Sequence, residues 1–506
     1  MAGAGKRLGN ESWVLLAWAL ISLPAFLISP ALDDWFTAAP YHQFDWAMLR
    51  PHLFWRPLEV LNRTLAAKFL FFYPGYLHLS AVVGHGACAL LLLRILRSNR
   101  LPSQLQDTAS LRTAGVLLFV VAPGLVAPVW SVDGAIQIWS TMFGLAATHG
   151  LVTSRQRRRR PVAWLAWLAL AALSKESGLG WSIAAPLIAW AMRSGNAGES
   201  TKDSSTRSLV WELCVAALFV SLYFLVRYLL VDAEAPVLAG GRYQLQFSPW
   251  LLLRNAAMVF GVAISTVDTV FLLSKTGNAW LGLATGSLSL PLLFMLCRGV
   301  LRKGANLRVL GAWSVAALAI VGPHLPLGRV SEMYAHPLVA VLVLFFVSEL
   351  EKRRLTATRS LPRAARLAFA LTLIAVLAVN LHKVTAMWNT AEGAAKVGRR
   401  VAKRVGGSPL KRICAVVPSN WKAPGYSVFL AAPGPASAWG LSVRSQLGYR
   451  EPYPGAVHRV HRRVECPTAT DLVLVFSETG ELAEIEPSTV LSGAKNLEAR
   501  LPRNLK

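Results

Sequence analysis

Long apolar blocks separated by short polar segments run through the first three quarters of the chain. Most blocks have roughly 17–23 residues, the length of a helix that crosses the hydrocarbon core of a bilayer. The blocks cover residues 13–31, 76–96, 111–127, 134–152, 161–175, 177–192, 209–231, 251–273, 279–297, 309–325, 334–350 and 365–381. This pattern predicts an α-helical polytopic membrane protein.

Clusters of Lys and Arg indicate how these helices cross. They lie at 6–7, 94–112, 155–160, 193–208, 298–308 and 351–366. Positive residues favour cytoplasmic loops, and all six clusters fall inside only if eleven blocks cross. We therefore expect about 11 spans, a cytoplasmic N-terminus, and one element between 232 and 297 that is re-entrant or lies flat. Block 251–273 is the more suspect, because it contains Arg254, Asn255 and Asp268.

The predicted topology divides the chain into a transmembrane domain, 1–381, and a tail, 382–506. The first exoplasmic loop, 32–75, is long and aromatic, and a second covers 232–250. Within the first, Leu58, Leu61 and Leu65 recur at helical spacing. This spacing predicts a helix over 57–70 that lies along the membrane surface.

The tail is polar and contains two β-like runs, at 412–417 and 471–476. We expect a small exoplasmic α/β domain there. Cys414 and Cys466 would form a disulfide in that compartment, or remain as two free thiols; both alternatives stay open.

Composition narrows the class of protein further. Of 506 residues, 54% are hydrophobic and only 15% are charged, with a mean hydropathy of +0.45. These values exclude a soluble multidomain enzyme and a disordered chain. The net charge of +26 is explained by basic cytoplasmic loops, so no nucleic-acid partner is expected. The high Ala, Arg and Leu content is typical of a GC-rich bacterium. We therefore expect an integral inner-membrane protein whose tail is periplasmic.

Acidic residues in two predicted outer loops are the first candidates for chemistry. Asp33 and Asp34 directly follow the first span, and Asp133 lies in the short turn between spans three and four. Adjacent carboxylates suit a general base or a divalent cation such as Mg or Mn. The structural alternatives are a helix cap with a solvated neighbour for Asp33 and Asp34, and a plain turn residue for Asp133.

Cations at the same predicted face are the second group of candidates. Lys175 and Glu176 separate two spans, either as a hairpin tip or as a cation for a phosphate and an anion for a hydroxyl. The remaining candidates for substrate binding are His52, Arg56, Arg242 and Tyr334. Such a face suits a substrate with a lipid tail in the membrane and a phosphate at its surface.

Four short motifs and a weaker fifth carry a resemblance to a family. They are Asp33-Asp34-Trp35; Phe54-Trp-Arg-Pro-Leu58 with Asn62 and His78; Ala127-Pro-Val-Trp-Ser-Val-Asp-Gly134; Leu173-Ser-Lys-Glu-Ser-Gly178; and Ser331-Glu-Met-Tyr-Ala-His-Pro337, in which Met333 replaces an Arg of relatives. In this order they resemble the GT-C-fold glycosyltransferases, and in particular the bacterial relatives of dolichyl-phosphate-mannose protein mannosyltransferases. The resemblance covers about residues 10–350.

The resemblance implies transfer of a hexosyl or pentosyl group, with inversion, from a polyprenyl-phosphate sugar to a glycan, lipid or protein acceptor of the cell envelope. It implies that Asp34, preferred over Asp33, is the general base, and that Asp133 is a second carboxylate that positions the acceptor or a metal. Lys175 and Arg56 would balance the charge of the lipid phosphate as it leaves.

Two other classes of function remain open from the sequence. A transporter or flippase of lipid-linked sugars would also explain the spans and outer charges, although transporters place polar residues near the midplane and show repeated halves. An O-antigen polymerase or ligase is the third candidate, but its Arg and His residues gather in a large late loop.

Overall fold

The structure is a computed structural model of the whole chain. The residues it describes are 10–27, 46–49, 55–69, 74–98, 107–154, 163–194, 199–230, 246–265, 306–327, 332–354, 367, 371, 374–385, 387–388, 413–417, 457–461, 472–476 and 482–485.

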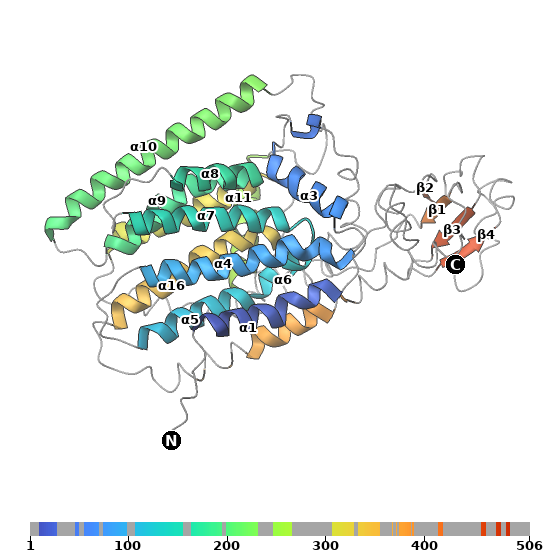
Figure 1. Cartoon of the computed structure of the whole chain (residues 1–506), viewed down its shortest axis with the longest axis horizontal. Coiled ribbons are helices and arrows are strands. Elements are labelled where there is room, and N and C mark those ends of the chain that lie inside the picture. The colour runs from blue at the N-terminus through green and yellow to red at the C-terminus, as the bar shows by residue number, and fades with distance from the viewer. Residues whose placement is uncertain are drawn as a thin grey trace.

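Most of the described residues form one bundle of α-helices with nearly parallel axes (Figure 1). The helices are α1 (Asn10–Ser22), α3 (Pro57–Phe69), α4 (Leu79–Ser98), α5 (Asp107–Val121), α6 (Pro123–Trp130), α7 (Ala135–Ser154), α8 (Ala163–Ser174), α9 (Gly180–Ser194), α10 (Glu199–Leu230), α11 (Pro249–Ile264), α15 (Leu307–Val321) and α16 (Ala335–Arg354). A further apolar helix covers Ile374–Thr385. Short 3-10 turns are η1 (Leu23–Leu27), η3 (Trp46–Leu49), η4 (Pro74–His78), η6 (Glu176–Leu179), η8 (Gly322–His324) and η9 (Glu332–Tyr334).

Several of these helices have the length and hydropathy of membrane spans. Among the described residues, four helices qualify, or five if the bent pair Ala109–Val121 and Pro123–Trp130 counts as one. The apolar window of α10 is only 17% buried within the protein. Large apolar side chains there and on α1 face outward, such as Leu218 (70% exposed) and Leu20 (68% exposed). The chain is thus a helical membrane protein, because lipid rather than protein must cover these surfaces.

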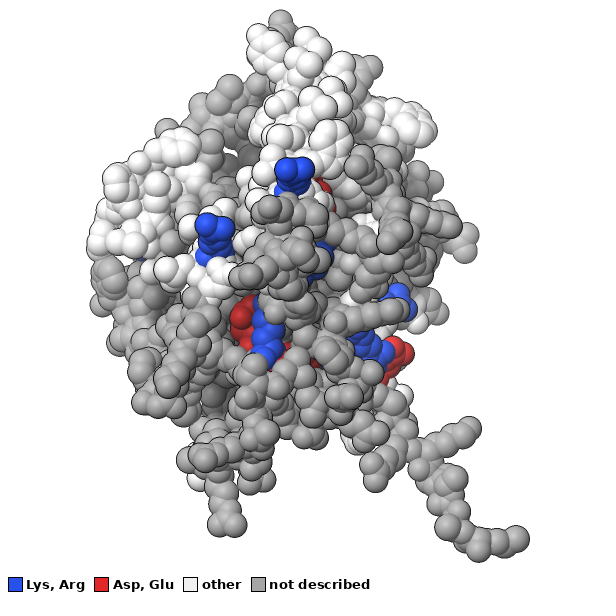
Figure 2. All heavy atoms as spheres, turned by 90° about the vertical axis from the view of Figure 1, so that its left-hand side faces the viewer, with Lys and Arg blue, Asp and Glu red and all other residues white. Residues whose placement is uncertain are grey.

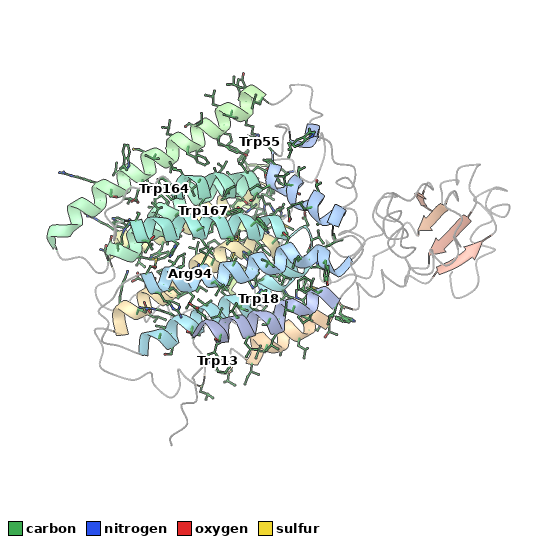
Figure 3. All side chains as sticks on the ribbon, in the orientation of Figure 1. Trp13, Trp18, Trp55, Arg94, Trp164 and Trp167 are labelled. Atoms are coloured by element: carbon green, nitrogen blue, oxygen red, sulfur yellow. The ribbon has the colours of Figure 1, made fainter. Side chains whose placement is uncertain are left out.

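The interior is packed by small residues against aromatic ones. Helix α7 packs between α4 and α8, and α9 packs against α15. Trp130, Trp181 and Phe119 are fully buried. A Cβ at Gly144 would lie 2.1 Å from the Trp181 ring, so α7 and α9 approach closely only because this position lacks a side chain. Figure 3 shows the tryptophans Trp164 and Trp167 along α8.

Two element boundaries differ from the prediction. The third apolar block is not one helix, because α5 and α6 meet at a bend of 56°. Pro123 at the start of α6 lacks the N–H that a continuous helix requires. Helix α10 also begins ten residues earlier than the predicted span, since its polar N-terminal stretch contains neither Gly nor Pro.

Ion pairs between helix ends gather at one end of the bundle. Arg97 of α4 pairs with Glu11 of α1, and Arg112 of α5 pairs with Glu351 of α16. The Arg193–Glu212 pair joins α9 to α10. Figure 2 shows Lys, Arg, Asp and Glu side chains together on the left-hand side of Figure 1. This is the end at which the sequence predicts a cytoplasmic surface; the site described below lies at the opposite end.

The length of helix α11 is consistent with the expectation that block 251–273 does not cross the membrane. At 16 residues it is about 24 Å long, short of the roughly 30 Å of a hydrocarbon core. Asn255 is fully buried and donates to the carbonyls of Leu325 (2.7 Å) and Leu327 (2.8 Å). These contacts satisfy a polar side chain that would be costly against lipid. The next predicted block, 279–297, lies outside the described residues.

The tail contains a four-stranded mixed sheet with strand order β2-β1-β3-β4. Strands β1 (Ile413–Val417) and β3 (Leu472–Phe476) confirm the two predicted runs. They pair in parallel, with Ile413 opposite Leu472. Strand β2 (Val457–His461) pairs parallel to β1, and β4 (Leu482–Ile485) pairs antiparallel to β3. Cys466 lies outside the described residues, so the disulfide remains a prediction.

Candidate functional site

Five of the nine predicted site residues lie together at one end of the bundle. They are Asp133, Arg56, Lys175, Glu176 and Tyr334, and they come from four separate segments of the chain. The other four, Asp33, Asp34, His52 and Arg242, lie outside the described residues.

Helix α3 supplies the wall of this site, and its polar face points inward. Glu59 and Arg63 are only 6% and 9% exposed, whereas Leu61 and Leu65 are 42% and 56% exposed. The predicted helix over 57–70 is therefore confirmed, with its leucines on the outer surface. Figure 1 shows α3 at the end of the bundle opposite the cluster of ion pairs. This orientation suits a helix whose leucines rest in lipid while its charges face the protein.

Asp133 is held in its turn by a close backbone approach. The backbone N–H of Gly134 donates to the Ser131 carbonyl at 3.2 Å. A Cβ at Gly134 would lie 1.9 Å from the Pro128 carbonyl oxygen, so only glycine fits this position. Arg63 donates to Asp133 at 2.6 Å and also pairs with Glu59. Asp133 is thus an ion-paired site residue as well as a turn residue.

A second ion pair joins α3 to the segment after α8. The Nε of Arg56 lies 3.0 and 2.8 Å from the two carboxylate oxygens of Glu176, and its Nη2 lies 2.8 Å from Oε2. Its Nη1 lies 3.3 Å from Glu59. Such a forked contact fixes the guanidinium in one orientation. Glu59 therefore links both arginines, at i+3 from Arg56 and i−4 from Arg63.

Glu59 is a site residue that the sequence analysis missed. Its spacing from the two arginines on one polar helix face was the available indication. His324 was also missed, and its ring stacks on Tyr334 at 3.8 Å between centroids. The residues that precede His324 in the sequence show no pattern that would predict its position beside Tyr334.

Lys175 differs from the two arginines in its partners. Its Nζ lies 3.4 Å from the Met333 sulfur and 5.0 Å from the centroid of the Tyr334 ring. No carboxylate in the described part of the chain forms an ion pair with it, although its side chain is buried (6% exposed). A cation over an aromatic ring and beside a thioether keeps its charge available to an incoming anion.

The charges of the site alter the ionisation of its members. Burial lowers the pKa of Lys175 to about 8, and the charge of Arg56 acts in the same direction. Burial opposes ionisation of Asp133, but the charges of Arg63, Lys175 and Arg56 outweigh it and hold its pKa below the usual value. Asp133 is therefore a weak base, better suited to binding than to proton abstraction.

The described residues contain no group of three or more His, Cys, Asp and Glu side chains placed to hold a metal ion. The predicted ligands Asp33 and Asp34 are not among those residues.

Comparison with known proteins gives similarity to solved structures. No family model and no curated protein matches the sequence. Among solved structures, the chain is similar to ArnT from Cupriavidus metallidurans, which was solved bound to undecaprenyl phosphate. The identity is 14%, the match covers 87% of this chain and 77% of that one, and the TM-score is 0.39.

The Arg63 contacts yield a prediction about stability. Replacing Arg63 with methionine leaves the Glu59 and Asp133 carboxylates without this partner in a poorly solvated site. We expect the free energy of unfolding to fall by about 3–5 kcal/mol, measured by SDS titration of the purified protein. The exposed pair Arg97–Glu11, at 38% and 54% side-chain exposure, is the control. Replacing Arg97 with methionine should cost about 0–1 kcal/mol, and equal costs would contradict the description of the site.

Proposed function

We propose that the chain is a membrane glycosyltransferase. It moves a sugar from a polyprenyl-phosphate donor to a glycan, lipid or protein acceptor at the exoplasmic, or periplasmic, face. The observation that carries the proposal is the position of Lys175. Its buried ammonium group faces a thioether and an aromatic ring. It lies beside a cluster of ion-paired side chains, which are Asp133, Arg63, Glu59, Arg56 and Glu176. Four of the five motifs that resemble GT-C enzymes contain residues of this site, namely Arg56, Asp133, Lys175 with Glu176, and Met333 with Tyr334. The motif Asp33-Asp34-Trp35 lies outside the described residues.

The reaction we propose is a direct displacement at the anomeric carbon. The acceptor hydroxyl oxygen bonds to that carbon while the bond from carbon to phosphate oxygen breaks, so the configuration inverts. The hydroxyl proton passes to the carboxylate of Asp34. The electron pair of the broken bond leaves with the lipid phosphate, whose charge Lys175 offsets.

The other charged groups of the site act as binding groups in this proposal. Arg56 is engaged by Glu176 and Glu59, so its role is to hold Glu176 for an acceptor hydroxyl and to add positive potential. Asp133 positions the acceptor. His52 and Arg242, which the sequence places in predicted outer loops, would contact the donor. Asp33 and Asp34 would hold a divalent cation. Transfer assays with and without EDTA test this role.

Sugar transfer should depend on pH through Lys175. Its pKa of about 8 means that the ammonium form predominates below pH 8 and is lost as the pH rises above it. We therefore expect kcat/KM to fall with increasing pH above about 8. The charged neighbours of Lys175 are Arg56, Asp133, Glu59 and Glu176.

The matched control for this pH dependence is Lys175→Arg. A guanidinium stays protonated to a much higher pH, so transfer by this variant should no longer fall near pH 8. An unchanged fall in Lys175→Arg would assign the titration to another group.

A further inference from the structure

The bend between α5 and α6 leaves the last carbonyls of α5 without helical donors. A helix C-terminus has unpaired carbonyls, and Pro123 offers no N–H to continue the ladder. In an apolar environment each such carbonyl requires another donor. The helix Ile374–Thr385 supplies donors on both sides of the bend. Asn380 donates to the carbonyl of Val121, the last residue of α5, and Lys383 donates to the carbonyl of Pro123, the first residue of α6, at 2.8 Å.

Lys383 also reaches the stretch that contacts Lys175. Its Nζ lies 2.7 Å from Oε1 of Glu332, the residue directly before Met333 and Tyr334. Lys383 and Glu332 are only 1% and 5% exposed. One ammonium therefore joins two segments: α6, which leads into the Asp133 turn, and η9, which carries the thioether and ring facing Lys175.

A buried ion pair is a costly way to gain stability. Desolvating two charges offsets most of their attraction, and apolar residues of similar volume often stabilise a protein as well or better. An ion pair in this position accordingly calls for a role other than stability, such as fixing one arrangement of the segments that it joins.

We propose that Lys383, assisted by Asn380, is a positioning residue that fixes the place of η9 and α6 relative to Lys175 and Asp133. This inference rests on the proposed function for its effect on catalysis. The geometry that it describes does not depend on that function. In this inference Lys383 acts through Glu332 and the backbone of Pro123, to which it donates hydrogen bonds, and not by contact with the substrate.

The test is the double variant Lys383→Met with Glu332→Gln, which removes both charges and leaves neither one buried alone. Two quantities are measured: kcat and KM for the sugar donor, and the rate at which acetic anhydride modifies Lys175, followed by mass spectrometry. We expect kcat to fall about 10- to 100-fold through misplacement of the reacting groups. We also expect KM to change little and Lys175 to be modified several times faster.

A matched control is present at the other end of the bundle. Lys352 pairs with Glu349 at 2.7 Å and donates to the Ala191 carbonyl at 3.2 Å. The double variant Lys352→Met with Glu349→Gln should leave kcat and the modification of Lys175 as in the wild type.

The modification rate decides the outcome. A rate for Lys175 equal to that of the wild type and the control overturns the inference, whatever the value of kcat. If the wild type transfers no sugar from any donor, the proposed function fails, and the modification rate still tests the positioning role. If the double variant does not fold, Glu332→Asp takes its place. This variant retains both charges but shortens the side chain that pairs with Lys383 by one methylene. Faster modification of Lys175 in this variant would support the inference, and a rate equal to that of the wild type would overturn it.

Discussion

Replacing Lys175 with methionine is expected to lower kcat for sugar transfer by about 100- to 1000-fold, the usual cost of removing one electrostatic contact to the developing charge. The variant should fold, because methionine fits the volume of the lysine stem and its neighbours are the Met333 sulfur and the Tyr334 ring. Burying an apolar side chain there also removes the desolvation cost of the ammonium. The measurement is transfer of labelled sugar in membranes, with protein levels matched by blot.

Two variants control for this result. Lys352→Met removes an equivalent charge from the opposite end of the bundle and should leave kcat unchanged. Lys175→Arg retains the charge with a different shape, so it should keep more activity than methionine. Full activity of Lys175→Met at matched abundance would mean that the leaving phosphate is balanced elsewhere.

Asp34→Asn is expected to lower kcat by about 100- to 10,000-fold, the range typical of a lost general base. The amide retains the size of the side chain but cannot accept the hydroxyl proton. We expect the variant to fold, because Asn has nearly the same size and shape as Asp. The measurement is the same transfer assay, with circular dichroism and detergent stability as checks on the fold.

Asp133→Asn and Asp33→Asn distinguish the base from the binding carboxylates. Asp133 pairs with Arg63 at 2.6 Å. Its replacement should therefore raise KM by a larger factor than it lowers kcat, and it should also lower the stability of the protein. Asp33→Asn should have a smaller effect on kcat than Asp34→Asn. A larger loss of kcat in Asp33→Asn would move the role of base to that residue.

The positions of most of the described helices could be predicted, because apolar blocks of bilayer length mark them directly. The 56° bend at Pro123 was missed because the apolar residues continue through it and hydropathy does not register a lost N–H. Helix α3 was predicted by its leucine spacing. The face that packs against the protein was not, because an amphipathic helix at a membrane surface turns its leucines toward lipid rather than toward the core.

The candidate site was predicted where topology alone brings residues to one face. One span lies between the spans that precede Asp133 and Lys175, so those two spans run in the same direction and both residues fall at the same end of the bundle. The contacts themselves join residues far apart in sequence: Arg56 meets Glu176 across 120 positions and Lys175 meets Met333 across 158. No periodic pattern encodes such pairs, and for this reason Glu59, His324 and the bridge made by Lys383 emerged only from the structure.

Sugar transfer from a lipid phosphate at the site of Lys175 can be assayed in membranes. Membranes containing the wild type, Lys175→Met or Asp34→Asn at equal abundance are supplied with a panel of labelled polyprenyl-phosphate sugars. We predict that the wild type transfers label from at least one donor to membrane glycan, lipid or protein, and that both variants lose this transfer. Absence of transfer from every donor, together with movement of the intact lipids across the bilayer by the wild type and both variants, would contradict the claim and identify a transporter instead.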